Sequence, residues 1–468
     1  MKTTILALSL CYIVSLSSAL LGSEKIGINY GRIGNNLPSP YRSIELLQSM
    51  NVRHVKLYDS DPEVLKLLSE TDIHVSIMIP NDQISRIASN RSEADQWVNQ
   101  NILTHYPSTR IRFVLVGNEV FSNNDKQMWL DLVPAMRYIR KSLSELNIHN
   151  IKVGTPVAMD VLETSFPPSA GKFRSDIPAQ VMRSLMKFLN GTRSFIFLDV
   201  YPFFPWSKNP TTMSLDFALL KEGNLTYTDP NSGLIYTNAL DQMLDSVNFA
   251  MAKLGFEGIR MAISETGWPH EGDIDQPGAN AYNSATYLCN LAAKMSYEPP
   301  LGTPARPGVE IPTFIFSLYD ENQKPGPGTE RHWGILSSSG RSIHQMDLAG
   351  SCPAGDKGGA ARHLAKPVNN RPYKGKIWCV LATKTMREVD LAPAVEFACL
   401  QGNATCNELA PGGACYTPVS IVSHANYAFS SYWSKFRGDG ASCYFDGLAV
   451  QTIVDPSHGS CKFPSVTV

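Results

Sequence analysis

The chain carries almost no net charge, because 41 Lys and Arg residues are balanced by 42 Asp and Glu residues. Nucleic acids and anionic membranes bind strongly basic surfaces, so neither is an expected partner, and a neutral ligand fits the charge balance better. With 43% hydrophobic and 18% charged residues, the 468-residue chain is also not a disordered protein. It is long enough for a large buried core and more than one domain.

Long hydrophobic runs are missing beyond the N-terminus, and no later stretch could cross a bilayer. The start, MKTTILALSLCYIVSLSSAL, has Lys2, an apolar run and then small residues, which predicts a secretory signal peptide over 1–23. A retained membrane anchor is the alternative, but serines dilute the run. After Cys461 the sequence KFPSVTV lacks the hydrophobic tail of a glycolipid-anchor signal. These features predict a secreted protein with no membrane anchor.

No C-x-x-C pair occurs among the nine cysteines, which disfavours a zinc site built on cysteine. Six of them lie in the last hundred residues or so: Cys379, Cys399, Cys406, Cys415, Cys443 and Cys461. In a secreted chain this density indicates a small module held by three disulfides, whose pairing the spacing alone leaves open. Whether Cys289 and Cys352 pair with each other is open as well.

A change in composition divides the chain into two regions. Residues 349–376 are rich in Gly, Ala, Pro and basic residues without apolar periodicity, and they indicate a linker between 24–348 and 377–468. Sequons that permit N-glycans, and so agree with secretion, occur at Asn90, Asn190, Asn224 and Asn403.

The large region alternates short apolar runs of strand character with segments of helical spacing. The eight runs cover 25–31, 52–59, 74–80, 111–119, 151–159, 194–203, 258–267 and 311–320. Runs that are apolar almost throughout suit parallel strands covered on both faces, so the pattern predicts a (β/α)8 TIM barrel. A doubly wound open sheet is the alternative, but the first turn, NYGRIGNN, is not the G-x-G-x-x-G phosphate motif.

Two carboxylates stand at the ends of predicted strands. Glu119 closes the fourth run in VLVGNEV, and Glu265 closes the seventh in AISETGWP. In a (β/α)8 barrel the carboxyl ends of the strands carry the active site. One protonated and one ionised carboxyl group are what glycoside hydrolysis needs. A salt bridge or a loop hydrogen bond is the alternative role for either residue alone.

Four motifs then point to a family. In this order, IGINYGRIGNNLPSP, VGNEV, ISETGWP and LYDENQKPG resemble the signatures of plant family 17 glycoside hydrolases, the endo-β-1,3-glucanases, over about 26–347. The resemblance implies a (β/α)8 barrel that hydrolyses β-1,3-glucan internally and with retention, without a metal or organic cofactor. It assigns Glu119 as the acid/base and Glu265 as the nucleophile.

The resemblance also assigns residues around this pair. Asn118 is expected to hold the sugar 2-hydroxyl, and Tyr201 to donate a hydrogen bond to the nucleophile. Tyr58 resembles a second cleft tyrosine, although either tyrosine could instead be barrel packing. Glu321 and Lys324 match a charged cluster near the acid/base.

Flat sugar faces need aromatic platforms, and Trp268 and Phe204 are the favoured candidates among Phe203, Phe204, Trp206, Trp268 and Trp333. The segment 205–238 is too long for a simple connection and predicts a small subdomain beside the cleft. Tyr319-Asp320 replaces the Phe-Asn of many relatives and adds an anion that could change nearby pKa values.

The C-terminal region resembles the plant family 43 carbohydrate-binding module, also called X8, which binds β-1,3-glucan. That resemblance implies the pairs Cys379–Cys443, Cys399–Cys406 and Cys415–Cys461. A stapled domain without a ligand is the alternative. The aromatic residues of this region could stack on sugar or form its core, and spacing does not separate these roles for Tyr427, Phe429, Tyr432 and Trp433.

Over both regions the chain is similar to anther-specific members of the family, which implies callose as substrate in the cell wall during pollen development. A monomer is the expected state. One rival hypothesis is a glucan-binding wall protein without hydrolytic activity, which the presence of both Glu119 and Glu265 disfavours. A second rival is a mannanase or cellulase, which Gly-Trp-Pro after Glu265 and the X8-like region disfavour.

Overall fold

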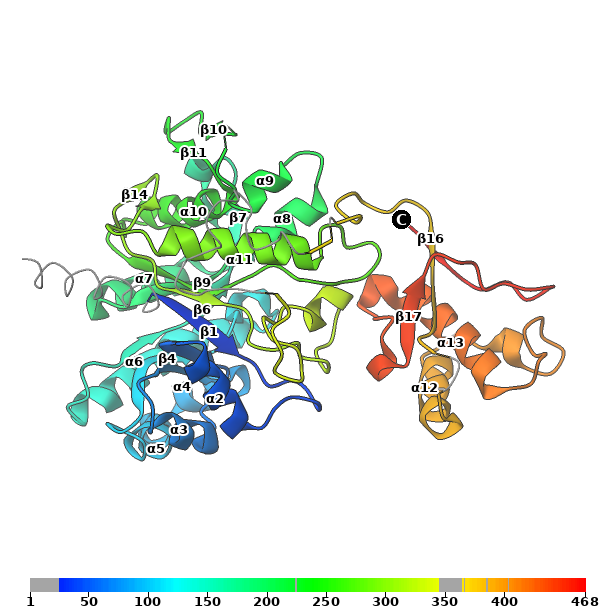
Figure 1. Ribbon diagram of the computed structural model, residues 1–468. Helices are drawn as coiled ribbons and strands as arrows, with labels where there is room; N and C mark the ends of the chain where they lie inside the picture. Colours follow the sequence, from blue (N-terminus) through cyan, green and yellow to red (C-terminus); the bar gives the residue numbers. More distant parts are fainter. Residues whose placement is uncertain (1–24, 224, 345–363, 366, 384–385, 403) are drawn as a thin grey trace, which may run out of the picture.

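The computed structural model describes residues 25–468 except 224, 345–363, 366, 384–385 and 403. The predicted signal peptide, most of the predicted linker and the sequons at Asn224 and Asn403 fall outside these residues. Two bodies are visible in Figure 1, a large barrel and a smaller C-terminal module. Within the described part of the chain, no helix has the length and apolar character needed to span a membrane.

The predicted strand runs form one parallel sheet. Its members are β1 (Ile26–Tyr30), β2 (His54–Leu57), β3 (His74–Ile79), β4 (Arg110–Val116), β5 (Lys152–Gly154), β6 (Pro156–Ala158), β9 (Phe195–Asp199), β12 (Arg260–Thr266) and β15 (Thr313–Ile315). The order is β5-β4-β3-β2-β1-β15-β12-β9-β6. Because β5 and β6 are halves of one run on either side of Thr155, this order closes on itself. The predicted (β/α)8 barrel is confirmed.

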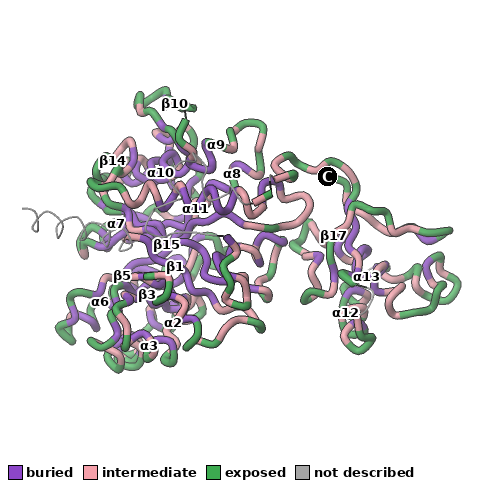
Figure 2. The backbone as a smooth tube through the Cα atoms, viewed as in Figure 1, coloured by how far each residue is buried: buried purple, intermediate pink, exposed green. Residues whose placement is uncertain are grey.

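Helices cover the outside of the barrel, and the strands are buried at its centre (Figure 2). The main helices are α2 (Pro40–Ser49), α3 (Pro62–Leu68), α4 (Ile84–Ser89), α5 (Arg91–Val98), α6 (Lys126–Glu145), α7 (Ala179–Thr192), α10 (Ala239–Lys253) and α11 (Ala281–Met295). Several of these helices begin with a polar residue that caps the N-terminus. The Asp61 carboxylate accepts from the backbone N–H groups of Glu63 and Val64 at the start of α3.

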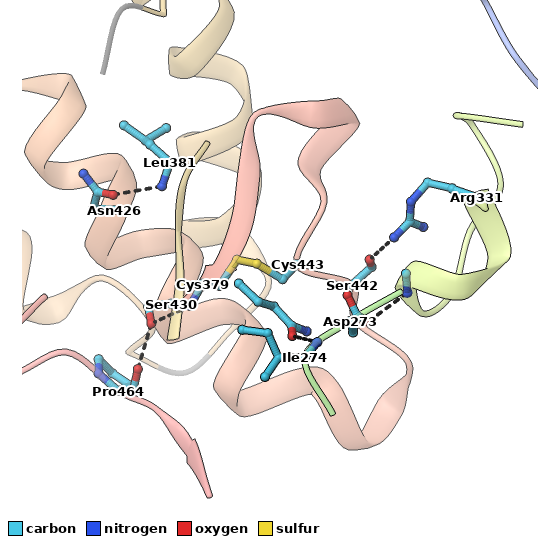
Figure 3. The surroundings of a disulfide bond; sticks show 12 residues. Asp273, Ile274, Arg331, Cys379, Leu381, Asn426, Ser430, Ser442, Cys443 and Pro464 are labelled. Carbon is cyan, nitrogen blue, oxygen red and sulfur yellow. Dashed lines mark hydrogen bonds between the residues drawn. A yellow bond between two sulfur atoms is a disulfide. The ribbon is translucent and has the colours of Figure 1, made fainter. Parts of the chain in front are cut away.

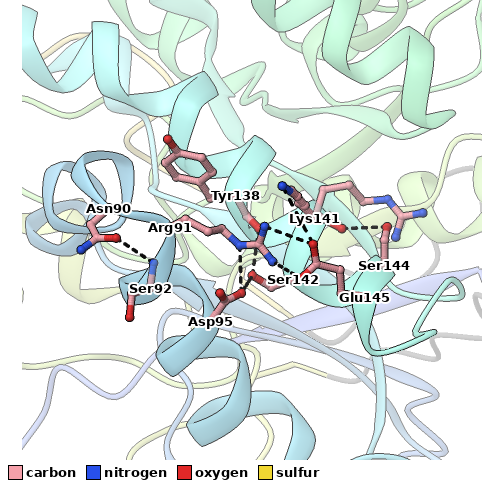
Figure 4. Close-up of polar contacts among 10 residues, drawn as sticks. Asn90, Arg91, Ser92, Asp95, Tyr138, Lys141, Ser142, Ser144 and Glu145 are labelled. Atoms are coloured by element: carbon pink, nitrogen blue, oxygen red, sulfur yellow. Dashed lines mark hydrogen bonds and ion pairs between the residues drawn. The ribbon is translucent and has the colours of Figure 1, made fainter.

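Helices α5 and α6 are joined by charged contacts (Figure 4). Arg91 donates to Asp95 on its own helix over 2.9 Å and to Glu145 of α6 over 2.6 Å. Asn90, the asparagine of a predicted glycosylation sequon, caps α5 because its Oδ1 accepts from Ser92 N. Its side-chain nitrogen is the atom that a glycan would modify.

The long segment after β9 folds into a small subdomain, as predicted, but none of its described residues within 205–238 lines the cavity at the strand ends. It contains α8 (Phe203–Lys208), α9 (Leu215–Ala218) and a hairpin of β10 (Tyr227–Thr228) and β11 (Ile235–Tyr236). Most of it lies beside α10 and α11 in Figure 1.

The C-terminal module contains a three-stranded antiparallel sheet and two helices. The elements are β16 (Lys376–Leu381), β17 (Ala449–Thr452), β18 (Val466–Thr467), α12 (Glu388–Leu400) and α13 (Ile421–Phe436). The disulfides join Cys379 to Cys443, Cys399 to Cys406 and Cys415 to Cys461, which are the pairs that the resemblance implies. Cys289, in α11, is also disulfide-bonded, and Cys352 lies outside the described residues.

Aromatic side chains of α13 form the core of this module. Phe429 is fully buried and stacks on Phe445 with ring centroids 4.1 Å apart. Trp433 and Tyr427 are buried as well, and only Tyr432 is partly exposed. Three of the four aromatics considered for sugar stacking therefore have a packing role.

The module contacts the barrel at the loops that follow β12 and β15 (Figure 3). Ile274 N donates to Gln451 Oε1 over 2.9 Å, and Arg437 forms an ion pair with Asp275. Arg331 donates to Ser442 over 3.2 Å.

The preceding segment of chain is attached to the barrel too. Asn280 Nδ2 donates to the side-chain oxygens of Asn369 and Asn370 over 2.8 and 3.1 Å. Polar contacts of the module and of the segment before it therefore hold the module against the barrel. The composition of the linker alone does not predict this docking.

Reversing one charge tests this docking. We expect Arg437→Glu to release the module, because it places a second carboxylate against Asp275, and the radius of gyration measured by small-angle X-ray scattering should increase. Lys187→Glu, on the exposed face of α7, makes the same charge change away from the interface and should leave the radius unchanged. Equal radii for all three proteins would contradict a docked module.

Candidate active site

A cavity of about 680 Å³ opens at the carboxyl ends of the barrel strands. Its walls combine charged groups with aromatic rings. The lining residues are Gly31, Arg32, Ile33, Tyr58, Asp59, Asn118, Glu119, Tyr201, Phe204, Glu265, Phe316, Glu321, Lys324, Glu330 and Trp333. Every residue predicted for catalysis or sugar binding lines this cavity, except Trp268.

Glu265, near the end of β12, is held by three donors. Its Oε1 accepts from Lys56 Nζ over 2.7 Å and from Tyr58 Oη over 2.6 Å. Its Oε2 accepts from Tyr201 Oη over 2.8 Å. Burial alone would raise the pKa of Glu265, but the charge of Lys56 and these hydrogen bonds hold it below the ordinary value. The carboxylate is therefore ionised and fixed in orientation.

Lys56 is one of the site residues that the sequence did not predict. It lies in β2 with its side chain fully buried, paired in register with Asn29 of β1. Its ammonium group also lies 4.2 Å from the centre of the Tyr58 ring. A lysine inside a strand covered on both faces needs a buried partner, and that signal was present in VRHVKLYD.

Glu119 follows β4 in a left-handed backbone conformation, with φ at 47°. This conformation is uncommon for residues other than glycine and persists where the surroundings enforce it. Asn81 supplies part of that support, because its side chain accepts from Asn118 N over 2.7 Å and donates to Asn118 O over 2.9 Å. Glu119 N donates to Pro156 O.

The surroundings of Glu119 favour its neutral form. Burial, and then the negative charge of Glu265, raise its pKa from 4.5 to about 7, against the opposing charge of Lys56. One cavity thus holds a protonated and an ionised carboxyl group below neutral pH. That division is what an acid and a nucleophile require.

Further charged groups complete the wall after β15. Glu321 is almost fully buried and accepts from Ile33 N over 2.7 Å, and burial raises its pKa. Lys324 Nζ lies 3.9 Å from Glu321 Oε2 and 4.1 Å from the centre of the Phe316 ring. Glu330 also lines the cavity and was not predicted, and burial raises its pKa too.

The choice of Trp268 as a sugar platform was wrong. Only 1% of Trp268 is exposed, and its indole N–H donates to Gly278 O over 2.8 Å. The ring packs against Trp206 of α8 and Tyr287 of α11, in the outer layer of the barrel. Phe204 and Trp333 both line the cavity.

Asp320 does not place an anion in the cavity. Its carboxylate oxygens lie 2.9 Å from His270 Nε2, and Oδ1 also accepts from Gly334 N. These contacts hold the pKa of Asp320 below its usual range in spite of burial. The side chain is therefore directed to the loop after β12, not to the cavity.

The strand ends of this (β/α)8 barrel bring together one protonated and one ionised carboxyl group among aromatic rings. This arrangement is typical of glycoside hydrolases. The chain belongs to the glycosyl hydrolases of family 17, whose family model matches residues 26–348. Residues 377–450 match the X8 domain.

Known proteins of plants are similar to the whole chain. The probable glucan endo-1,3-beta-glucosidase A6 of Arabidopsis thaliana is 57% identical over 446 residues, which cover 95% of this chain and 92% of that protein. Glucan endo-1,3-beta-glucosidase 3 of the same plant is 35% identical, and the match covers 96% of this chain and 86% of that protein.

The barrel also matches solved structures. CJP38, a beta-1,3-glucanase and allergen of Cryptomeria japonica pollen, is 36% identical with a TM-score of 0.65, and the match covers 69% of this chain and 99% of that one. A structure described as one of two plant beta-glucan endohydrolases with distinct substrate specificities is 31% identical, with a TM-score of 0.63 and the same coverage.

The two pKa shifts predict a bell-shaped pH dependence of kcat/KM. Activity should fall at low pH, where Glu265 gains a proton, and again as the pH rises through about 7, where Glu119 loses its proton. Glu119→Gln, assayed with an aryl glycoside whose leaving group needs no acid, should lose the fall at high pH. A basic limb that persists in this variant would assign it to another group.

Lys56→Met tests the buried ion pair. Without the ammonium group the pKa of Glu265 should rise, so the acidic limb should move to higher pH and kcat/KM at pH 5 should fall roughly 100-fold. The control is Lys66→Met on the exposed face of α3, which removes the same charge outside the cavity. A loss of activity without movement of the limb would indicate a purely structural lysine.

Proposed function

We propose that this chain is a secreted endo-β-1,3-glucanase that hydrolyses its polysaccharide substrate with retention, with Glu119 as acid/base and Glu265 as nucleophile. The observation that carries the proposal is the hydrogen bonding of Glu265 to Lys56, Tyr58 and Tyr201 beside a protonated Glu119. The named activities of the relatives support the choice of β-1,3-glucan.

Two displacements make up the reaction. In the first, a Glu265 oxygen attacks the anomeric carbon while Glu119 gives its proton to the departing glycosidic oxygen, and a covalent glycosyl ester forms. In the second, Glu119, now ionised, takes a proton from water, which attacks the same carbon and releases Glu265. Two inversions leave the β configuration unchanged.

The remaining cavity residues bind the sugar chain in this proposal. Asn118 holds the 2-hydroxyl of the reacting sugar, where the hydrogen bond strengthens as positive charge develops on the ring. Phe204 and Trp333 offer apolar surface for sugar rings. Glu321 and Lys324 adjust the protonation of the pair and contact the substrate.

Product analysis tests the activity. The wild-type protein should release short oligomers of mixed length early from a linear β-1,3-glucan, because an open cavity admits the middle of a chain. Glu265→Ala should release none. Binding without cleavage by both proteins would instead favour a receptor in the cell wall.

The stereochemistry is tested separately. Proton NMR during the first minutes should show the β-anomer at the newly formed reducing end, before mutarotation. Initial appearance of the α-anomer would mean that water attacks directly and that Glu265 is not a nucleophile.

The C-terminal module is proposed to bind β-1,3-glucan and so to raise the local concentration of insoluble substrate at the cavity. A chain ending at 375 should lose more activity on insoluble glucan than on soluble oligomers. Equal loss on both substrates would contradict a binding role. Arg437→Glu, which retains the module but removes its ion pair to the barrel, shows whether docking contributes.

We also propose a domain organisation, a location and a natural substrate for the chain. The chain is expected to consist of a signal peptide over 1–23, a catalytic domain over 24–348, a linker over 349–376 and a glucan-binding module over 377–468. It is expected to act as a monomer in the cell wall, with N-glycans at some of its sequons. Callose around developing pollen is proposed as the natural substrate, on the resemblance of the sequence to anther-specific members of the family.

A further inference from the structure

Three side chains that can bind a metal ion meet outside the cavity, where the loop after β12 contacts the loop after β15. They are His270, Asp320 and His332, whose ligand atoms all lie within 4.8 Å of one another. The backbone joins the loops at the same place, because His270 N donates to His332 O over 2.9 Å. None of the three residues lines the cavity.

The distances suit a small tetrahedral ion. With metal–ligand bonds of about 2.0–2.1 Å, as for Zn²⁺, neighbouring ligand atoms of a tetrahedron lie about 3.3–3.4 Å apart. His270 Nε2 lies 2.9 Å from Asp320 Oδ2, and His332 Nδ1 lies 3.9 Å from the same oxygen. Shifts of about half an ångström would bring both nitrogens to the tetrahedral spacing.

The surroundings leave the ligand atoms available. Gly334 N donates to Asp320 Oδ1 and so fixes the carboxylate, and Oδ2 lies within 3.9 Å of a nitrogen of each imidazole. His332 Nδ1 is buried and has no hydrogen-bond partner among the described residues.

A fourth imidazole lies nearby. His344 is 5% exposed, and neither of its ring nitrogens has a hydrogen-bond partner in the described part of the chain. It is close enough to His270 and Asp320 for their charges to act on it. A buried imidazole without a partner is unusual, and a bound ion or water is one explanation for it.

We propose that His270, Asp320 and His332 form a binding site for a divalent transition-metal ion, with Zn²⁺ as the preferred ion. Two imidazoles and one carboxylate are ligands that suit Zn²⁺ and leave a fourth position for water or a further side chain. No sequence motif predicts this site, because its residues are 50 and 12 positions apart.

The ion stabilises the loops around the cavity and takes no part in hydrolysis. It joins the loop after β12 to Asp320, the neighbour of the cavity residue Glu321, and to His332, the neighbour of Trp333. Arg331, next to His332, contacts the C-terminal module. Metal binding therefore stabilises the wall of the cavity and the docking surface together.

Calorimetric titration of the chelator-treated full chain with ZnCl2 tests the site. We expect one Zn²⁺ per chain and, at about a hundredfold excess over Kd, a rise in Tm of roughly 5 °C. Both effects should be lost in His270→Asn and in His332→Asn. They should persist in His149→Asn, which removes an exposed histidine far away in sequence, before β5.

Cobalt provides a readout that is independent of stability. Co²⁺ bound at this site should give the intense visible absorption of a four-coordinate ion, and Zn²⁺ should displace it. The proposal is overturned if the wild-type chain binds no stoichiometric Zn²⁺. It is also overturned if the two cluster variants, folded as judged by circular dichroism, bind Zn²⁺ as tightly as His149→Asn does.

Discussion

The buried ion pair between Lys56 and Glu265 is the interaction on which the site depends. Both side chains lie in the barrel interior, where an unpaired charge is very costly, and breaking such a pair typically costs about 3–5 kcal/mol. The pair keeps Glu265 ionised although its side chain is largely buried. That negative charge in turn contributes to the raised pKa of Glu119. One lysine on β2 therefore affects both carboxyl groups.

The barrel explains why this arrangement is stable. Lys56 and Glu265 come from β2 and β12, which are separated in the sheet by β1 and β15. The hydrogen-bonded sheet fixes the relative position of the two residues, so little further conformational entropy is lost when their side chains form the ion pair. The loops beyond the strands have a second role, since the loop after β15 lines the cavity and, together with the loop after β12, holds the C-terminal module. The module is thus attached to one of the loops that line the cavity.

Much of the fold could be predicted because strands buried on both faces leave continuous apolar runs in the sequence. Because active sites of such barrels lie at the strand ends, the polar residues that end those runs, such as Glu119 and Glu265, could be predicted as site residues. Lys56 was missed because a single charge inside an apolar run was counted as part of the strand. Trp268 was misplaced because a sequence pattern does not show to which side the chain turns after a strand. The docking of the module depends on contacts between residues far apart in sequence, such as Ile274 with Gln451, and no local sequence pattern predicts them.

The most direct measurement is the identification of the residue that becomes covalently attached to the sugar. A 2-deoxy-2-fluoro-β-laminaribiosyl fluoride slows the second displacement more than it slows the first, so the glycosyl ester accumulates and can be located by peptide mass spectrometry. The account predicts a stoichiometric label on Glu265. A label on Glu119 or Glu321, or inactivation without any covalent label, would contradict it.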